Sequence, residues 1–212
     1  MIGLVAVTAA GRAAAYRLAA AWPERTRSYP GPAAQALPAA FGECSAVVSF
    51  LATGATVRLL AASIAAGDKA SDPGVVCVDE AGRFAVALLG GHGGGANQLA
   101  RAVAGVLGAE PVVTTGTDAA GVPGLDDLGL PVCGDVAGVG RAVLDGDPVA
   151  LVTERPWPLP AFPANVTRTV PRAGRAVALA SSAGPAGLVT EPVPGAPTVL
   201  VTDRAGPPGP GQ

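Results

Sequence analysis

The residues best suited to chemistry lie in a glycine-rich stretch, Gly90 to Gly95, around the single histidine of the chain, His92. The stretch separates an apolar run from an Ala-rich one, which predicts a loop between a strand and a helix. Backbone N–H groups of such a loop, with the N-terminus of the next helix, favour a carboxylate or phosphate. His92 could act as a general acid or base, or as an axial ligand to a metal carried by the substrate. The alternatives are glycines that serve backbone geometry alone and a surface histidine without a role.

Two other polar turns also follow apolar runs. The Thr53 hydroxyl and the Gly54 N–H could stabilise an oxyanion, with Arg58 one helical turn further on. Alternatively, Thr53 only caps a helix and Arg58 is solvated, and for Thr53 alone we favour the cap. The run from Thr114 to Asp118 offers three hydroxyls and a carboxylate, or else a simple Ser/Thr turn.

These turns would meet if the preceding strands belonged to one parallel sheet, because parallel strands end at the same edge. A ligand crevice is therefore expected at that edge, although the pattern does not identify the ligand. A further polar turn, residues 68–73, contains the single lysine of the chain, Lys69. That turn is a surface loop unless it folds back over the crevice.

The elements that would position these turns alternate along the chain. Apolar runs predict strands at residues 2–7, 46–50, 75–78, 84–89 and 111–114, and helices are expected at 11–21, 55–66 and 96–107. The short segment 79–82 predicts a hairpin between two of the strands. Residues 25–38 are interrupted by proline and glycine and are expected to be irregular. The pattern is typical of an α/β fold with a mostly parallel sheet in three layers.

A second, smaller α/β domain is expected after a Gly/Pro/Asp-rich segment that begins at residue 119. A helix is predicted at 136–144 and strands at 149–153, 176–181 and 198–201, whereas residues 154–163 contain too many prolines for a regular element. We therefore predict an N-terminal domain over 1–120, a middle domain over 125–204, and a disordered Gly/Pro tail over 205–212.

Composition excludes several classes of protein. The net charge is −2 and charged residues make up 14%, so nothing favours nucleic acid or anionic lipid. The chain has no run of eighteen uninterrupted apolar residues and no basic segment before its first apolar run, which predicts a cytoplasmic protein without a membrane span. Cys44, Cys77 and Cys133 lie far apart, so we interpret them as structural and expect no protein metal site.

Several runs keep one order and spacing across roughly residues 46–118. They are Leu51-Ala52-Thr53-Gly54-Ala55-Thr56-Val57-Arg58, Asp68-Lys69-Ala70-Ser71-Asp72-Pro73, Val78-Asp79-Glu80-Ala81-Gly82-Arg83-Phe84, Gly91-His92-Gly93-Gly94-Gly95-Ala96-Asn97 and Thr114-Thr115-Gly116-Thr117-Asp118. Together they resemble the N-terminal domain of the cobalt-precorrin-5A hydrolases of cobalamin (vitamin B12) biosynthesis. Residues 130–204 resemble the middle domain of this family more loosely, and no counterpart of its C-terminal domain is expected here.

The resemblance implies a reaction on a corrinoid: opening of the ring-A lactone of cobalt-precorrin-5A and release of acetaldehyde, giving cobalt-precorrin-5B. We assign acid/base catalysis to His92, with Asp118 orienting it or replacing it, and oxyanion stabilisation to Thr53 and the Gly54 N–H. Substrate carboxylates and other polar groups would be bound by Gly54, Arg58, Lys69, Gly91, Gly93, Gly94, Gly95, Asn97, Thr114, Thr115 and Thr117.

No protein cofactor is expected, since cobalt would arrive in the substrate. The alternative is a non-catalytic tetrapyrrole-binding module, or a partial subunit that works with a separate C-terminal-domain protein or a precorrin methyltransferase. A homodimer is also left open.

Overall fold

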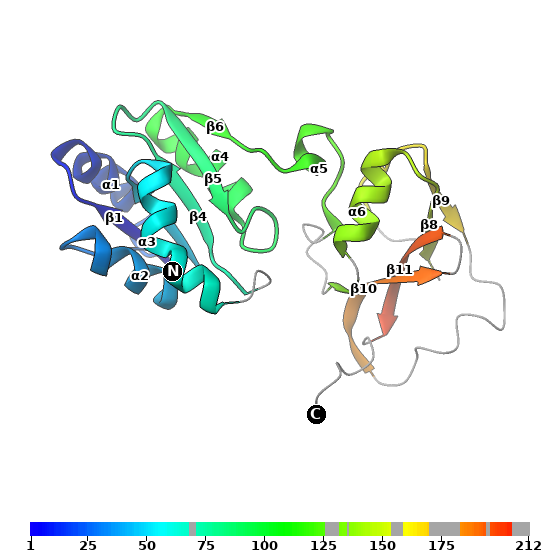
Figure 1. The fold of residues 1–212 in the computed structure, drawn as a ribbon. Helices are drawn as coiled ribbons and strands as arrows, with labels where there is room; N and C mark the ends of the chain where they lie inside the picture. Colours follow the sequence, from blue (N-terminus) through cyan, green and yellow to red (C-terminus); the bar gives the residue numbers. More distant parts are fainter. Residues whose placement is uncertain are drawn as a thin grey trace. The chain divides into compact units, whose positions relative to one another are not determined.

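The computed structural model describes residues 1–67, 71–125, 132–134, 136–153, 159–169, 183–193 and 196–204 (Figure 1). It divides the chain into two compact units, Met1–Thr115 and Gly116–Gln212. The two units are defined by how the chain packs. The domain boundaries predicted above, 1–120 and 125–204, stay predictions.

The first unit is built on a six-stranded sheet in the order β2-β1-β3-β4-β5-β6. Its strands are β1 (Ile2–Ala6), β2 (Thr26–Ser28), β3 (Ala46–Phe50), β4 (Gly74–Val78), β5 (Phe84–Leu89) and β6 (Glu110–Val112). Every neighbouring pair is parallel except β4 and β5. The predicted α/β class with a mostly parallel sheet is therefore confirmed.

Helices cover both faces of this sheet, which makes three layers (Figure 1). They are α1 (Ala9–Ala21), α2 (Ala33–Glu43), α3 (Thr53–Ala66) and α4 (Ala96–Leu107). Because side chains alternate along a strand, Leu4 packs with α1 and α4 while its neighbour Val5 packs with α2 and α3. Burial on both faces explains why the strands are continuous apolar runs.

The hairpin between β4 and β5 reverses the direction of the chain. Gly82, with φ of +66°, takes the left-handed conformation that its tight turn requires. Since β5 runs antiparallel to β4 and β6 runs parallel to β5, both β5 and β6 end at the edge where β1, β3 and β4 begin. The loops after β5 and β6 thus lie opposite the turn after β3.

The prediction of an irregular segment over residues 25–38 is wrong, because the structure places β2 and most of α2 there, with Pro38 inside the helix. An interior proline costs about 3 kcal/mol. Leu37 and Phe41 are fully or almost fully buried beside it, and each buried side chain of this size contributes about 1.5–3 kcal/mol. Burial against the sheet therefore offsets the lost helical hydrogen bond.

The second unit contains a five-stranded sheet in the order β7-β10-β11-β8-β9. Its elements are α5 (Gly116–Ala119), β7 (Val132–Gly134), α6 (Val136–Asp145), β8 (Val149–Thr153), β9 (Val166–Thr169), β10 (Ala183–Val193) and β11 (Ala196–Arg204). The predicted helix over 136–144 and the strands over 149–153 and 198–201 are confirmed, whereas β7, β9 and β10 were not predicted. The strand predicted over 176–181 and the tail predicted over 205–212 lie outside the described residues.

Candidate functional site

A pocket of about 910 Å³ opens at the edge of the first unit where β1, β3 and β4 begin. We call it the edge pocket. Its lining includes Trp22, Arg25, Ser45, Asp72, His92 and the glycines at 93–95. The volume is at the upper end of the roughly 300–1,000 Å³ typical of small-molecule sites. Two of the polar turns singled out from the sequence contribute to this pocket, one through residues 71–73 and the other through residues 92–95.

The glycine loop of the edge pocket is pressed against the segment before β4. A Cβ on Gly94 would lie 2.7 Å from the Gly74 nitrogen and 2.9 Å from the Asp72 carbonyl oxygen, and one on Gly74 would collide with the Gly94 carbonyl. These neighbours are backbone atoms that cannot move aside, so only glycine fits at 74 and 94. The glycine at 94 is therefore explained by backbone geometry alone. Gly93 is exposed and lines the pocket.

The backbone at the N-terminus of α4 is hydrogen-bonded to its own loop, and the anion site predicted there stays a prediction. The N–H groups of Gly95, Ala96 and Asn97 donate to the carbonyls of His92, Gly90 and Gly91 at 2.8, 3.0 and 3.0 Å. These three N–H groups donate to carbonyl oxygens of their own loop. They are therefore not available as donors to a bound carboxylate. Three of the backbone donors that the sequence offered to an anion are therefore used inside the protein.

Asn97 is a buried tie between two of the predicted turns. Asn97 is only 2% exposed, and its Nδ2 donates a hydrogen bond to Oγ1 of Thr115 at 2.9 Å. The bond holds the end of the segment after β6 to the first turn of α4, so the glycine loop and Thr115 share an edge as predicted. Thr114 is exposed beside it.

The turn after β3 does not join this site. Thr53, Gly54 and Arg58 are exposed and begin α3 at the opposite edge of the sheet. Thr53 lines a different, apolar pocket of about 450 Å³ with Cys77, Asp79 and Phe84. The expectation that all three turns share an edge is therefore wrong for this turn, because the β4–β5 hairpin sends His92 to the other edge.

Thr53 is not the helix cap either. Ala52 occupies the N-cap position of α3 without a side-chain cap bond. The buried hydroxyl is that of Thr56, whose Oγ1 lies 2.9 Å from Ser49 Oγ and 3.3 Å from the Ala52 carbonyl oxygen. Ser49 and Thr56 thus form a buried structural pair at this turn. The sequence alone does not distinguish the buried Thr56 from the exposed Thr53.

Three further predicted site residues are also not placed with His92. Lys69 lies outside the described residues. Thr117 and Asp118 belong to α5 in the second unit. The pairing of His92 with Asp118 therefore stays a prediction.

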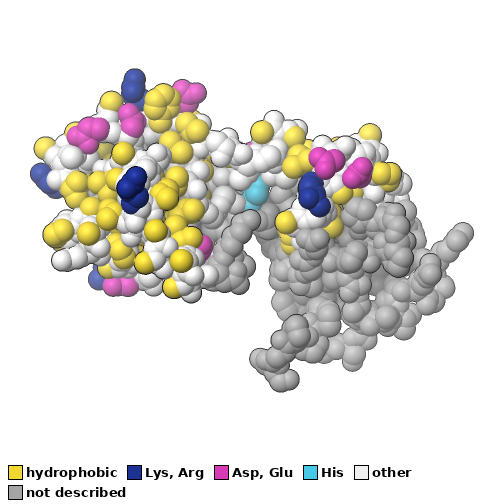
Figure 2. Space-filling model, viewed as in Figure 1, with side chains coloured by type: hydrophobic (Ala, Val, Ile, Leu, Met, Phe, Trp, Pro, Cys, Tyr) yellow, Lys and Arg dark blue, Asp and Glu magenta, His cyan; other side chains and the backbone are white. Residues whose placement is uncertain are grey.

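Trp22 and Arg25 line the edge pocket and were missed in the sequence. The Arg25 guanidinium carbon lies 6.0 Å from the centroid of the Trp22 ring, within cation–π distance. The sequence feature that could have indicated these two residues is a tryptophan three positions before an arginine, in the segment between a helix and a strand. On the face shown in Figure 2, the basic side chains of the first unit are scattered among apolar ones.

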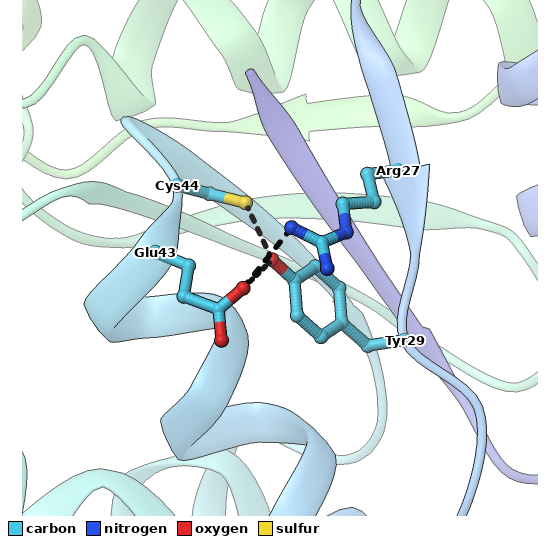
Figure 3. A network of polar contacts seen from close by, with 4 residues as sticks. All are labelled: Arg27, Tyr29, Glu43 and Cys44. Carbon is cyan, nitrogen blue, oxygen red and sulfur yellow. Dashed lines mark hydrogen bonds and ion pairs between the residues drawn. The ribbon is translucent and has the colours of Figure 1, made fainter.

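Cys44 also borders the edge pocket, but its thiol is part of a structural network (Figure 3). The Tyr29 hydroxyl lies 3.3 Å from Cys44 Sγ and donates to Glu43 Oε2 at 3.0 Å, and Arg27 contacts the same carboxylate oxygen at 3.1 Å. The hydrogen bond to Cys44, burial, and the hydrogen bond to Glu43 raise the pKa of Tyr29. The network fixes β2 to the end of α2.

Cys77 is also structural. It is 1% exposed, and burial raises the pKa of its thiol, an effect partly opposed by the hydrogen bond with Thr56. Among the described side chains, no group of three His, Cys, Asp or Glu residues could hold a metal ion. In the same part of the chain, no helix is long and apolar enough to cross a membrane.

Comparison with a solved structure supports the α/β fold class of the chain. A solved structure of a cobalamin biosynthesis protein G homolog from Sulfolobus solfataricus has a similar fold, with a TM-score of 0.50 and 17% identity over 95% of this chain and 60% of that one. Residues 35–118 match the family described as Cobalamin synthesis G N-terminal.

Two curated relatives match part of the chain. The chain is 43% identical over 138 residues to the cobalt-precorrin-5A hydrolase of Salmonella typhimurium, covering 60% of this chain and 39% of that protein. It is 37% identical over 95 residues to the cobalt-precorrin-5A hydrolase of Priestia megaterium, covering 45% of this chain and 25% of that protein. The matched part of the chain is thus similar to cobalt-precorrin-5A hydrolases, and the chain spans less than half of the length of these two relatives.

Proposed function

We propose that the chain acts in cytoplasmic cobalamin biosynthesis as a cobalt-precorrin-5A hydrolase, which opens the ring-A lactone and releases acetaldehyde to give cobalt-precorrin-5B. The observation that carries the proposal is the position of the edge pocket. Asp72, His92 and the glycines after it line this pocket, and all of them lie in the segment that matches the family, residues 35–118. No resident cofactor is needed, because the corrinoid substrate brings its own cobalt.

Within this proposal, His92 is the acid/base group. It is half-buried and lines the pocket, where partial exclusion of water strengthens its interactions with a bound ligand. The reaction also needs stabilisation of an acyl oxyanion. Thr53 and the Gly54 N–H cannot supply it beside His92, since they lie at the opposite edge of the sheet. Asp118, from the second unit, is the other group that we assign to the reaction.

The alternative is a tetrapyrrole-binding module without activity of its own. It is favoured by the edge pocket, which contains a histidine but none of the predicted oxyanion donors of the β3 turn. A C-terminal-domain protein or a precorrin methyltransferase would then complete the reaction, and a homodimer is a further arrangement that the proposal admits.

The test is acetaldehyde release from cobalt-precorrin-5A by this chain alone, compared with His92→Gln. Loss of a positioned acid or base lowers rates about 10²- to 10⁴-fold, so turnover should fall by at least about 100-fold while spectral titration shows binding within a few-fold of wild type. Arg83→Gln, at the far edge of the sheet, is the control and should leave both unchanged.

Each other outcome has one meaning. Equal turnover by His92→Gln would refute the role of His92. Binding without acetaldehyde release by the wild type would identify a binding module. Neither binding nor release would remove the proposed function from this chain.

A further inference from the structure

The edge pocket is long. It is lined by the segment before β2, by Ile2 at the start of β1, by the segments before β3 and β4 and by the loop after β5. These strands lie in the sheet in that order. Four strand spacings of about 4.8 Å separate its ends, or roughly 19 Å. Trp22 and Arg25 lie at one end, and His92 lies at the other. A ligand that reaches both ends must be broad and carry polar groups on its periphery.

The backbone of the Trp22–Arg25 end is held firmly in place. The Trp22 carbonyl accepts hydrogen bonds from Thr26 Oγ1 at 2.9 Å and from the Arg25 N–H at 3.1 Å. The Arg25 carbonyl accepts from the Ile2 N–H at 2.8 Å, which ties the turn to the first residue of β1. Arg25 therefore projects from a fixed turn, so little backbone entropy is lost when a ligand binds.

Arg25 carries a charge that the surrounding protein does not neutralise. Within the described part of the chain, the ion pairs are Arg27 with Glu43 and Arg83 with Asp79, and neither involves Arg25. Its recorded contact is with the Trp22 ring, which leaves the donors of the guanidinium available to a carboxylate. The half-buried indole packs against the core below and offers a ring edge or face to the pocket.

We propose that Trp22 and Arg25 form a second anchor of the edge pocket, which binds a peripheral carboxylate of the corrinoid at the end away from His92. The inference rests on the proposed function, because it takes the ligand to be a corrinoid with acetate and propionate side chains. The anchor positions the macrocycle and takes no part in the bond changes. Its loss should therefore raise Kd and KM while leaving the turnover at saturation unchanged.

The experiment is a titration of the full chain with cobalt-precorrin-5A, in wild type, Arg25→Gln and Arg83→Gln. Arg83 is a matched control, since its guanidinium also lies over an aromatic ring, Phe84, at 5.4 Å, but at the opposite edge of the sheet. We expect Arg25→Gln to raise Kd roughly tenfold and to weaken the salt dependence of binding, and Arg83→Gln to do neither. Equal melting temperatures would show that both variants fold.

A second readout follows Trp22 directly. The chain has two tryptophans, so in a Trp157→Phe background the emission comes from Trp22 alone. Bound corrinoid should quench this emission, and the quenching should saturate at the Kd found by titration. Unchanged Kd in Arg25→Gln, equal weakening by both arginine variants, or binding without quenching would each overturn the anchor while the proposed function stood. Absence of binding to the wild type would overturn both.

Discussion

At the scale of single residues, the clearest structural device is the buried hydroxyl pair of Ser49 and Thr56. Both residues are 0% exposed, and their oxygens are 2.9 Å apart. Ser49 is in β3 and Thr56 is in α3, so the bond crosses the turn that joins the two elements. A buried hydroxyl without a hydrogen-bond partner destabilises the folded state, so the contribution of each residue to stability depends on the presence of the other.

We therefore predict that Thr56→Val lowers the free energy of unfolding by about 1–3 kcal/mol, because Ser49 loses its partner in the core. Ser49→Ala should cost less, because Thr56 Oγ1 keeps its hydrogen bond to the Ala52 carbonyl oxygen. The double variant should cost clearly less than the two single costs added together, since no orphaned hydroxyl remains. Urea unfolding of the four proteins measures this, and strictly additive costs would show that the bond contributes nothing.

The sequence predicted some site residues and missed others for a physical reason. His92, Asn97 and Thr115 could be singled out because their residue types and their positions after strands are local properties of the chain. Trp22 and Arg25 reach the edge pocket only because β2 lies at the far side of β1, which is a property of strand order. Ser49 and Thr56 resemble any other hydroxyl in the sequence until burial separates them from Thr53.

At the scale of elements, the β4–β5 hairpin decides where the site lies. The sequence predicted the hairpin itself, yet the expectation of one common edge ignored its consequence. A hairpin reverses the next strand, so the turn after β3 and the loop after β5 lie at opposite edges of the sheet. The helix α2 was missed for a different reason: Pro38 argues locally against a helix, and only burial of its neighbours against the sheet overrides that preference.

Asp79 holds this hairpin closed. Its Oδ1 accepts from the Phe84 N–H at 2.7 Å, and its Oδ2 lies 3.6 Å from Arg83 Nε. Burial acts to raise the pKa of Asp79, but the hydrogen bonds from the backbone of Phe84 and Arg83 and the Arg83 charge outweigh it, so the pKa is lowered from 3.8. A lowered folded pKa means stability that is fully present above pH 3.8 and is lost as pH falls through the folded value.

We accordingly predict that Asp79→Asn is less stable than wild type at pH 7 by up to about 1 kcal/mol, the usual contribution of one such hydrogen bond. The difference should shrink below pH 3.8 and vanish once the wild-type carboxyl is protonated. Urea unfolding at pH 7 and pH 3 provides the comparison, with Glu24→Gln as a control on an exposed carboxylate of the same unit. A difference that grows toward pH 3 would contradict the assigned direction.

At the scale of the whole molecule, the matched family segment crosses the boundary between the two units. The match runs over residues 35–118, whereas the first unit ends at Thr115. His92 and Asp118 therefore belong to one family segment and to different units. If Asp118 orients His92 as proposed, the two side chains should behave as one group in kinetics.

A double-variant cycle tests this requirement. His92→Gln and Asp118→Asn should each lower acetaldehyde release from cobalt-precorrin-5A, and the double variant should be no slower than the slower single one. Groups that work as one unit lose their contribution together, so removing the second adds little. If the two losses multiply instead, the residues act independently and Asp118 is no orienter of His92. If only His92→Gln is slow, Asp118 takes no part in the reaction and the assignment of His92 alone stands.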